Sequence, residues 1–260
     1  MSRKLKIKFP KIDTHNLDQD EEFFYLIESD DKKRKILFHE YAEIYKITGL
    51  YEQLFYERLR CKSPSKVVEA LRYIVSQAQD NFSELRVLDL GAGNGVMGEE
   101  LKKYGCARLV GADIIYEAYE ACERDRPTIY DAYNVVDFCN LTEEQREDLE
   151  GWSFDCLTTV AALGFGDIPA KAFIEAFNIL KTKGWIAFNI KETFLDKSDT
   201  TGFSVIVREL IFSEYLDIYY LERYCHRLSM EGKPLYYFAI VGRKNADIPQ
   251  EFLTSIGITA

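Results

Sequence analysis

The amino-acid sequence predicts an α/β fold in which helices cover both faces of a mostly parallel sheet that ends in an antiparallel hairpin. Two observations lead to this prediction. From residue 85 to about residue 190, short apolar runs alternate with amphipathic stretches, a rhythm typical of repeated strand–helix units. After residue 215, two β-rich runs are separated only by the turn residues 230–234, which are too few for a crossover helix.

Seven strands and the helices between them follow from this pattern. We expect five parallel strands at 86–90, 108–112, 128–136, 154–159 and 185–190, and a hairpin of 216–228 with 235–242. We expect helices over 96–103, 116–124 and 169–180, and a further helix capped by Thr142.

The first third of the chain follows another pattern. Residues 1–35 are densely charged and predict an irregular, solvated arm. From residue 36, apolar and aromatic residues recur at helical spacing, and Ser63-Pro64 is typical of a helix start with Ser63 as its N-cap. We therefore divide the chain into an arm (1–35), a helical cap or lid (36–84), the α/β domain (85–245) and a C-terminal tail (246–260).

Composition excludes several classes of function. The chain has 260 residues, with 33 Lys and Arg against 43 Asp and Glu, and its net charge of -10 disfavours general nucleic-acid binding. The six cysteines are scattered without a CxxC pair, so neither a zinc site nor a disulfide framework is expected. The N-terminus lacks an apolar signal segment, and no run reaches the roughly 18 apolar residues of a membrane span. We expect a cytoplasmic protein with no bound metal and no membrane association.

A glycine-rich turn follows the first strand of the α/β domain. Gly91, Gly93 and Gly95 let the backbone turn sharply and let a ligand approach the main chain, as in dinucleotide enzymes. Asp113 ends the next strand, where a carboxylate can accept hydrogen bonds from ribose hydroxyls. Asp89 lies within the first strand, where an acid would repel a pyrophosphate but suits the ammonium and sulfonium of S-adenosylmethionine (SAM).

These residues resemble the class I SAM-dependent methyltransferases. The segment Val87–Gly95 resembles motif I of that family, and further segments resemble its later motifs in the same order: Val110–Ile114, Val136–Phe138, Phe154–Cys156 and Ile179–Trp185. The resemblance implies a Rossmann-like sheet of seven strands, SAM as cofactor and S-adenosyl-L-homocysteine (SAH) as product. It also implies cofactor contacts from Asp89, Gly91, Ala92, Gly93, Gly95, Asp113, Ile114, Asp137 and Phe138.

A narrower resemblance involves two other segments. Tyr41-Ala-Glu-Ile-Tyr45 resembles the Tyr-x-x-x-Tyr element that precedes the core in many small-molecule methyltransferases, and it implies that Tyr41 and Tyr45 close over the cofactor. With the run 161–170, the chain looks most like the Williams–Beuren-region methyltransferase-like proteins. The alternative is that both tyrosines are core aromatics of a helix.

The acceptor pocket is expected at the ends of the fourth and fifth strands, with Ala161, Leu163, Phe165 and Asn189 as candidates. No Asn/Asp-Pro-Pro element follows the fourth strand, which disfavours amino methylation of nucleic acids. The apolar run favours a small or partly apolar acceptor. Methyl transfer depends chiefly on alignment, so no catalytic residue is assigned. Two alternatives stay open: methylation of a protein side chain, and an NAD(P)-dependent oxidoreductase.

Overall fold

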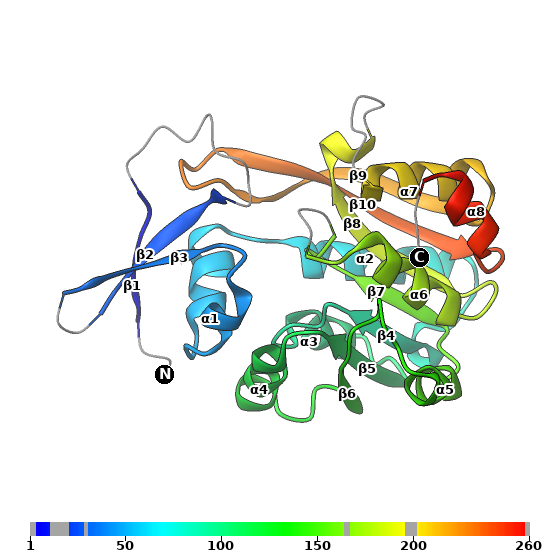
Figure 1. Ribbon diagram of the computed structural model, residues 1–260, viewed down its shortest axis with the longest axis horizontal. Helices are drawn as coiled ribbons and strands as arrows, with labels where there is room; N and C mark the ends of the chain where they lie inside the picture. Colours follow the sequence, from blue (N-terminus) through cyan, green and yellow to red (C-terminus); the bar gives the residue numbers. More distant parts are fainter. Residues whose placement is uncertain (1–3, 11–20, 29–30, 164–166, 196–201, 258–260) are drawn as a thin grey trace.

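A computed structural model of the chain describes residues 4–10, 21–28, 31–163, 167–195 and 202–257. Its centre is a seven-stranded sheet in the order β6-β5-β4-β7-β8-β10-β9 (Figure 1). The strands are β4 (Arg86–Leu90), β5 (Arg108–Asp113), β6 (Ala132–Val135), β7 (Cys156–Thr159), β8 (Trp185–Lys191), β9 (Leu216–Leu228) and β10 (Pro234–Lys244). The first five strands are parallel, and β10 pairs antiparallel with both β8 and β9. The predicted fold class is confirmed.

The strand order reverses at β4, because β5 and β6 lie on one side of it and β7 and β8 on the other. In open α/β sheets, ligands bind beyond the carboxyl ends of the strands at such a point. The glycine turn therefore stands at the place where a ligand is expected. The largest difference from the predicted strand boundaries is in β6, which begins at Ala132 rather than at Thr128, whose backbone has a φ of 63° that an extended strand does not allow.

Helices cover both faces of the sheet, and the side-chain alternation of the strands produces two separate cores. Val87 and Ala187 face a core shared with α2 and α3, whereas their neighbours Leu88 and Phe188 face the core beneath α5, α6 and α7. The helices are α2 (Ser63–Gln77), α3 (Val96–Lys102), α4 (Tyr116–Asp125), α5 (Glu143–Gly151), α6 (Ala170–Ile179), α7 (Gly202–Phe212) and α8 (Gln250–Ser255), with short 3-10 turns η3 (Phe82–Glu84) and η4 (Glu192–Leu195).

Local capping follows the sequence at one helix and departs from it at another. Thr142 accepts from the backbone N–H of Gln145, whose side chain accepts in turn from the backbone of Thr142, so the predicted cap of α5 is confirmed. Ser63 does not cap α2. Its hydroxyl lies 2.6 Å from Tyr224 Oη and 2.5 Å from His226 Nδ1, because β9 passes beside the start of this helix.

The N-terminal segment is not the irregular arm that its charge suggested. Strands β1 (Lys6–Lys8), β2 (Phe23–Ile27) and β3 (Lys33–Leu37) form an antiparallel sheet beside helix α1 (Tyr41–Tyr45) and the π-helix η2 (Glu52–Arg58) (Figure 1). In β1 the exposed Lys6 and Lys8 flank the buried Ile7, and in β3 three charged residues precede the buried Ile36, so the charge density hid these strands. The core of this N-terminal unit consists of Ile7, Phe24, Leu26, Ile36, Phe38, Ile44, Leu50, Leu54 and Leu59.

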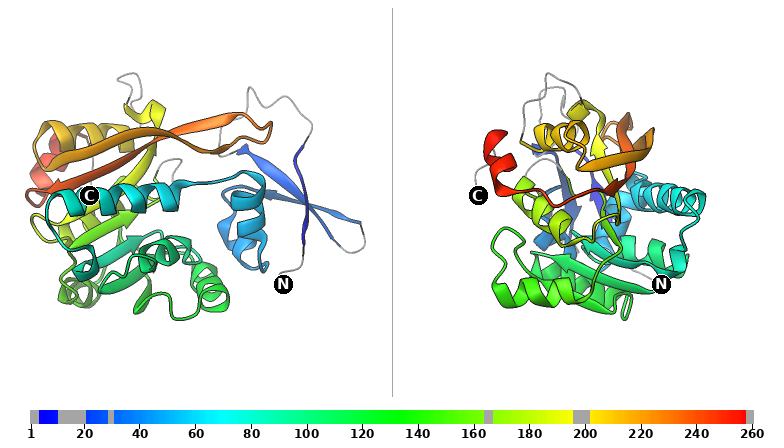
Figure 2. Two further views of the ribbon diagram at one scale, coloured as in Figure 1. Left: turned by 180° about the vertical axis from the view of Figure 1, so that it is seen from behind. Right: turned by 90° about the vertical axis from the view of Figure 1, so that its right-hand side faces the viewer.

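The hairpin of β9 and β10 reaches across to this N-terminal unit (Figure 2). The backbone N–H of Leu228 donates to the carbonyl of Leu59 (2.6 Å), and that of Lys62 donates to the carbonyl of His226 (2.9 Å). The chain is therefore joined by backbone bonds where β9 meets the approach to α2. All six cysteines are free thiols, and no helix in the described ranges is long and apolar enough to cross a bilayer.

Candidate cofactor and acceptor site

The glycine turn owes its shape to three left-handed residues. Gly91, Gly93 and Gly95 have φ values of 73°, 53° and 86°, which side-chain-bearing residues rarely adopt. The backbone N–H groups of Gly91 and Ala92 both donate to the carbonyl of Ala112 at the end of β5 (2.8 and 3.0 Å). The turn is thus fastened to the neighbouring strand and is held open toward the sheet edge.

Asp113 braces the same turn from the end of β5. The backbone N–H of Gly93 donates to its Oδ2 and that of Ile115 to its Oδ1, both at 2.9 Å. Burial raises the pKa of Asp113 above its usual value, and the backbone N–H groups of Ile115 and Gly93 oppose that shift. The carboxyl group therefore has a fixed orientation at the edge of the cavity described next.

A cavity of about 460 Å³ lies over the carboxyl ends of β4, β5 and β7. This volume is in the range of small-molecule sites. Most of the residues predicted to contact the cofactor or the acceptor line it: Tyr41, Tyr45, Gly91, Ala92, Gly93, Asp113, Ile114, Asp137, Phe138 and Ala161. The sequence did not point to other lining residues, among them Tyr51, Tyr56 and Val160.

The lining of this cavity is acidic. Three carboxyl groups, those of Asp113, Asp137 and Asp167, are among its lining residues, and neither lysine nor arginine is found among those described. The pKa of Asp137 is lowered, chiefly by the hydrogen bond from the Asn140 side chain and by the backbone N–H of Cys139. The cavity therefore favours a cation over a phosphate-bearing ligand.

Asp89 is a correction to the expected site, because it is buried behind the cavity rather than lining it. The Tyr130 hydroxyl donates to its Oδ2 and the Thr158 hydroxyl to its Oδ1, both at 2.7 Å. Burial raises the pKa of Asp89 to about 7, despite these two hydrogen bonds. These hydrogen bonds join β4 to β7 and to the segment before β6. They hold the end of β4, from which the glycine turn begins.

Three more expected residues do not line the main cavity, and a fourth cannot be placed. Gly95 begins α3 and faces Cys122 and Ile129. Asn189 is buried, where its Oδ1 accepts from the backbone N–H of Ala161 (2.7 Å), so it shapes the wall from behind. Phe165 lies outside the described residues. Leu163 lines a second, smaller cavity instead.

The aromatic wall of the cavity comes from the N-terminal unit. Tyr41 and Tyr45 stack with ring centroids 6.1 Å apart, and Tyr51 follows 5.1 Å from Tyr45. A Cβ placed on Gly93 would lie 2.4 Å from the Tyr45 hydroxyl, so that ring packs directly on the glycine turn. Tyr51 and Tyr56 continue the aromatic spacing of this segment, and this spacing is the signal that would have included them.

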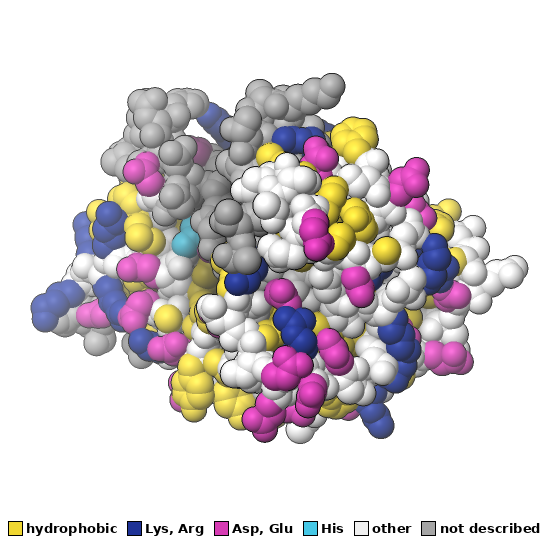
Figure 3. Space-filling view, turned by 45° about the vertical axis from the view of Figure 1, so that its right-hand side comes forward, with side chains coloured by type: hydrophobic (Ala, Val, Ile, Leu, Met, Phe, Trp, Pro, Cys, Tyr) yellow, Lys and Arg dark blue, Asp and Glu magenta, His cyan; other side chains and the backbone are white. Residues whose placement is uncertain are grey.

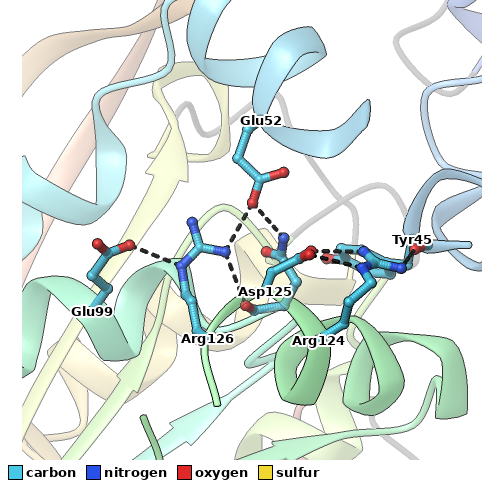
Figure 4. Close-up of polar contacts among 7 residues, drawn as sticks. Tyr45, Glu52, Glu99, Arg124, Asp125 and Arg126 are labelled. Carbon is cyan, nitrogen blue, oxygen red and sulfur yellow. Dashed lines mark hydrogen bonds and ion pairs between the residues drawn. The ribbon is translucent and has the colours of Figure 1, made fainter. Parts of the chain in front are cut away.

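A polar network fastens this wall to the turn (Figure 4). Glu52 of η2 accepts from Asn94 Nδ2 (2.7 Å) in the glycine turn and from Arg126 (2.8 Å) after α4. Arg126 also donates to Glu99 of α3 (2.8 Å), and Arg124 donates to the carbonyl of Tyr45 (3.0 Å). Charge-assisted bonds of this kind are stronger than neutral ones, so the segment 41–58 is held over the turn.

A histidine–aspartate pair also lines the cavity, and sequence analysis missed it. His39 Nδ1 lies 2.8 and 3.0 Å from the two carboxyl oxygens of Asp167. The two residues are 128 positions apart, and each stands next to a segment that the sequence did single out, Tyr41–Tyr45 and 161–170. Proximity to those segments was the only available signal.

Comparison with known proteins agrees with this architecture. Residues 88–188 match a family described as a methyltransferase domain, and no curated protein matches the chain. A structure from Thermoplasma acidophilum has a TM-score of 0.51 at 15% identity and covers 77% of this chain and 97% of that one. Magnesium protoporphyrin IX methyltransferase from Synechocystis, with bound SAM, has a TM-score of 0.49 at 12% identity, covering 70% and 79%. The seven-stranded sheet thus has the class I methyltransferase fold, and residues 88–188 match a methyltransferase domain.

Proposed function

We propose that this chain transfers a methyl group from SAM to a small-molecule acceptor, leaving SAH. The observation that supports this most directly is the charge of the cavity, where three carboxyl groups line the wall without a lysine or arginine among the described lining residues. SAM has a sulfonium and an ammonium and lacks phosphate, so it suits this wall. A nicotinamide dinucleotide would place its pyrophosphate among carboxylates, which disfavours the oxidoreductase alternative.

Different residues of the cavity fit different parts of SAM. The Asp113 carboxyl at the end of β5 would accept from the ribose hydroxyls, and Asp137 with Phe138 would contact the adenine. The glycine turn with Tyr45 would take the methionine end. SAM supplies an activated methyl group when bound, and the chain aligns it with the acceptor and excludes water through the aromatic wall.

Two features support a small acceptor. The cavity is partly covered by the wall of Tyr41, Tyr45, Tyr51 and Tyr56, which leaves little room for a macromolecule. On the face shown in Figure 3, acidic side chains are interspersed with basic ones, and the net charge is -10. This arrangement disfavours binding to a phosphate backbone. The free thiols favour a cytoplasmic location, and the Tyr41–Tyr45 segment with the run 161–170 favours a place near the Williams–Beuren-region proteins.

Thermal unfolding with and without ligand tests the cofactor. We expect SAM and SAH at a hundredfold excess over their dissociation constants to stabilise the chain by about 3 kcal/mol, or roughly 5 °C or more. NADH and NADPH at the same concentrations should leave the midpoint unchanged. Stabilisation by a nicotinamide cofactor alone would overturn the proposal.

A further inference from the structure

The pair of His39 and Asp167 stands between two cavities. Besides the main cavity, a chamber of about 40 Å³ lies deeper between the N-terminal unit and the hairpin. Both spaces share His39, Tyr41, Tyr51, Ala161 and Asp167. The side chains of His39 and Asp167 are each 20% exposed, so they are accessible from the cavity and yet partly desolvated.

The chamber is largely aromatic and apolar. Its remaining lining residues are Phe38, Phe55, Cys61, Leu163, His226, Arg227 and Tyr237. His39 and Asp167 therefore contribute to the walls of both spaces. A volume of this size holds only a few heavy atoms, so it suits one edge of a small acceptor rather than a polymer.

The other titratable groups facing the chamber are poorly suited to accept a proton. Burial lowers the pKa of His226 to about 3, so its imidazole is neutral and only weakly basic. Burial raises the pKa of the Tyr41 phenol and the Cys61 thiol, so both keep their protons. Arg227 is a cation, paired with Glu22 at 2.7 Å. His39 differs from these groups because a carboxylate is bonded to its Nδ1.

A proton donated from Nδ1 to Asp167 fixes the tautomer of His39 that has its lone pair on Nε2. This is the arrangement by which a carboxylate orients a histidine base and stabilises the imidazolium that forms. Among the described residues that line the chamber, Asp167 supplies the carboxylate, and His39 already bonds to both of its oxygens, so the chamber offers no second carboxylate to pair with an ammonium acceptor. A neutral hydroxyl on an aromatic or apolar body needs no such partner.

We propose that the acceptor is a small hydroxyl compound of the phenol type and that His39 is its general base, with Asp167 as the positioning residue. This inference rests on the proposed function. The hydroxyl oxygen forms a bond to the methyl carbon of SAM as the carbon–sulfur bond breaks, and that electron pair stays on sulfur to give the thioether SAH. The hydroxyl proton passes to His39 Nε2, and Asp167 stabilises the imidazolium.

Cofactor binding is measured first, so that failure of the two proposals can be told apart. Calorimetry with SAM and SAH should give dissociation constants within about threefold of wild type for His39→Gln. Asp167→Asn removes one of the three cavity carboxyl groups, so its turnover is compared with wild type at saturating SAM. Asp148→Asn, an exposed acid on α5 away from the cavity, is the matched control for the loss of charge. A wild-type chain that binds neither SAM nor SAH would contradict the proposed function itself.

Turnover is then measured as SAH release with phenol, catechol, 4-nitrophenol, benzoate and benzylamine as probes. We expect wild type to methylate the phenols. His39→Gln should lose about 100-fold or more in kcat/KM on phenol, whose pKa is about 10, because general bases contribute about 10²–10⁴-fold. At about pH 9, 4-nitrophenol is ionised and has no proton to give up, so the loss in kcat/KM on this probe should stay below about threefold.

Asp167→Asn should lose about tenfold on phenol, in kcat rather than in KM, because it acts through the orientation of His39. Asp148→Asn should match wild type on every probe. Equal losses on phenol and on 4-nitrophenol would mean that His39 is structural and would overturn the inference. SAM binding without turnover of any phenol, or turnover of benzoate or benzylamine alone, would overturn it as well.

Discussion

Among single residues, Asp113 connects the glycine turn to the proposed ribose site. Its two oxygens already accept from Gly93 and Ile115, and each retains lone pairs for a ligand. Asp113→Ala removes these acceptors, and charge-assisted hydrogen bonds contribute about 1.5–3 kcal/mol each. We expect SAM affinity to fall about tenfold or more, as measured by calorimetry.

Asp113→Asn separates the two roles of this residue. The amide retains one oxygen for the turn but loses the charge, so it should weaken SAM binding while the thermal midpoint changes less than in Asp113→Ala. Asp148→Asn again serves as the control for a lost carboxylate. Unchanged affinity in both Asp113 variants would place the ribose elsewhere in the cavity.

Asp89 makes a different prediction, because it is buried behind the site. Its pKa is raised from 3.8 to about 7, so between these values the folded chain binds a proton that the unfolded chain has released. The contribution of Asp89 to stability is therefore fully present below about pH 4 and is lost as the pH rises to about 7. The difference between the two pKa values corresponds to roughly 4 kcal/mol of unfolding free energy.

Asp89→Asn removes this titration. Between about pH 4 and pH 8, wild type should lose up to roughly 4 kcal/mol of unfolding free energy relative to the variant. The Tyr130 and Thr158 hydroxyls can rotate to bond an amide, so the packing is retained. Urea unfolding at several pH values measures the effect, and a pH-independent difference would show that Asp89 does not titrate in this window.

At the scale of elements, the segment 41–58 depends on Glu52 for its polar attachment to the glycine turn. Glu52→Gln removes a charge from two hydrogen bonds, one to Asn94 and one to Arg126. We expect SAM to dissociate several-fold faster and the amides of 41–58 to exchange faster, with little change in global stability, because the core of the N-terminal unit is unchanged.

Glu99→Gln is the matched control for this prediction. Glu99 also accepts from Arg126 at 2.8 Å, but it belongs to α3 rather than to the segment 41–58. It should leave both SAM dissociation and the exchange of 41–58 near wild-type values. If the two variants behave alike, Arg126 rather than the attachment of the wall controls cofactor release.

The same elements show what the sequence was able to predict. The parallel strands and the hairpin were found because buried strands have continuous apolar runs and because turn residues separate β9 from β10. Strands β1 and β3 were missed because Lys and Arg dominate these very short runs, and β2 was missed because it is a five-residue run between charged segments. Helix α7 was missed because its Val, Ile and Leu residues fit a helix and a strand equally well.

Site residues were predictable where local sequence fixes them. Asp113 and Asp137 end strands at the edge of the sheet, so their position follows from the topology. His39 and Asp167 meet only because the N-terminal unit packs against the loop after β7, and no local pattern encodes a contact over 128 residues. Asp89 shows the reverse case, since local sequence places it in β4 but does not show that its side chain is bonded to Tyr130 and Thr158 behind the cavity.

At the scale of the whole molecule, the cavity is assembled from two units with separate cores. The glycine turn, Asp113 and Asp137 belong to the large sheet, whereas the tyrosine wall and His39 belong to the N-terminal unit. Backbone bonds between β9 and the approach to α2, together with the buried pair of Arg227 and Glu22, join the two units. Stability of the N-terminal unit should therefore control cofactor binding at a distance.

Phe24→Ala tests this coupling. Phe24 is fully buried in β2, and truncation of a buried phenylalanine costs about 3–5 kcal/mol. The matched control is Phe177→Ala, which empties an equally buried position in α6, within the core of the large sheet. Both variants should unfold more easily, but only Phe24→Ala should accelerate amide exchange across 41–58 and weaken SAM binding at temperatures where the large sheet remains folded. Should Phe24→Ala bind SAM as tightly as wild type, the tyrosine wall would have to be stable without the N-terminal sheet beneath it.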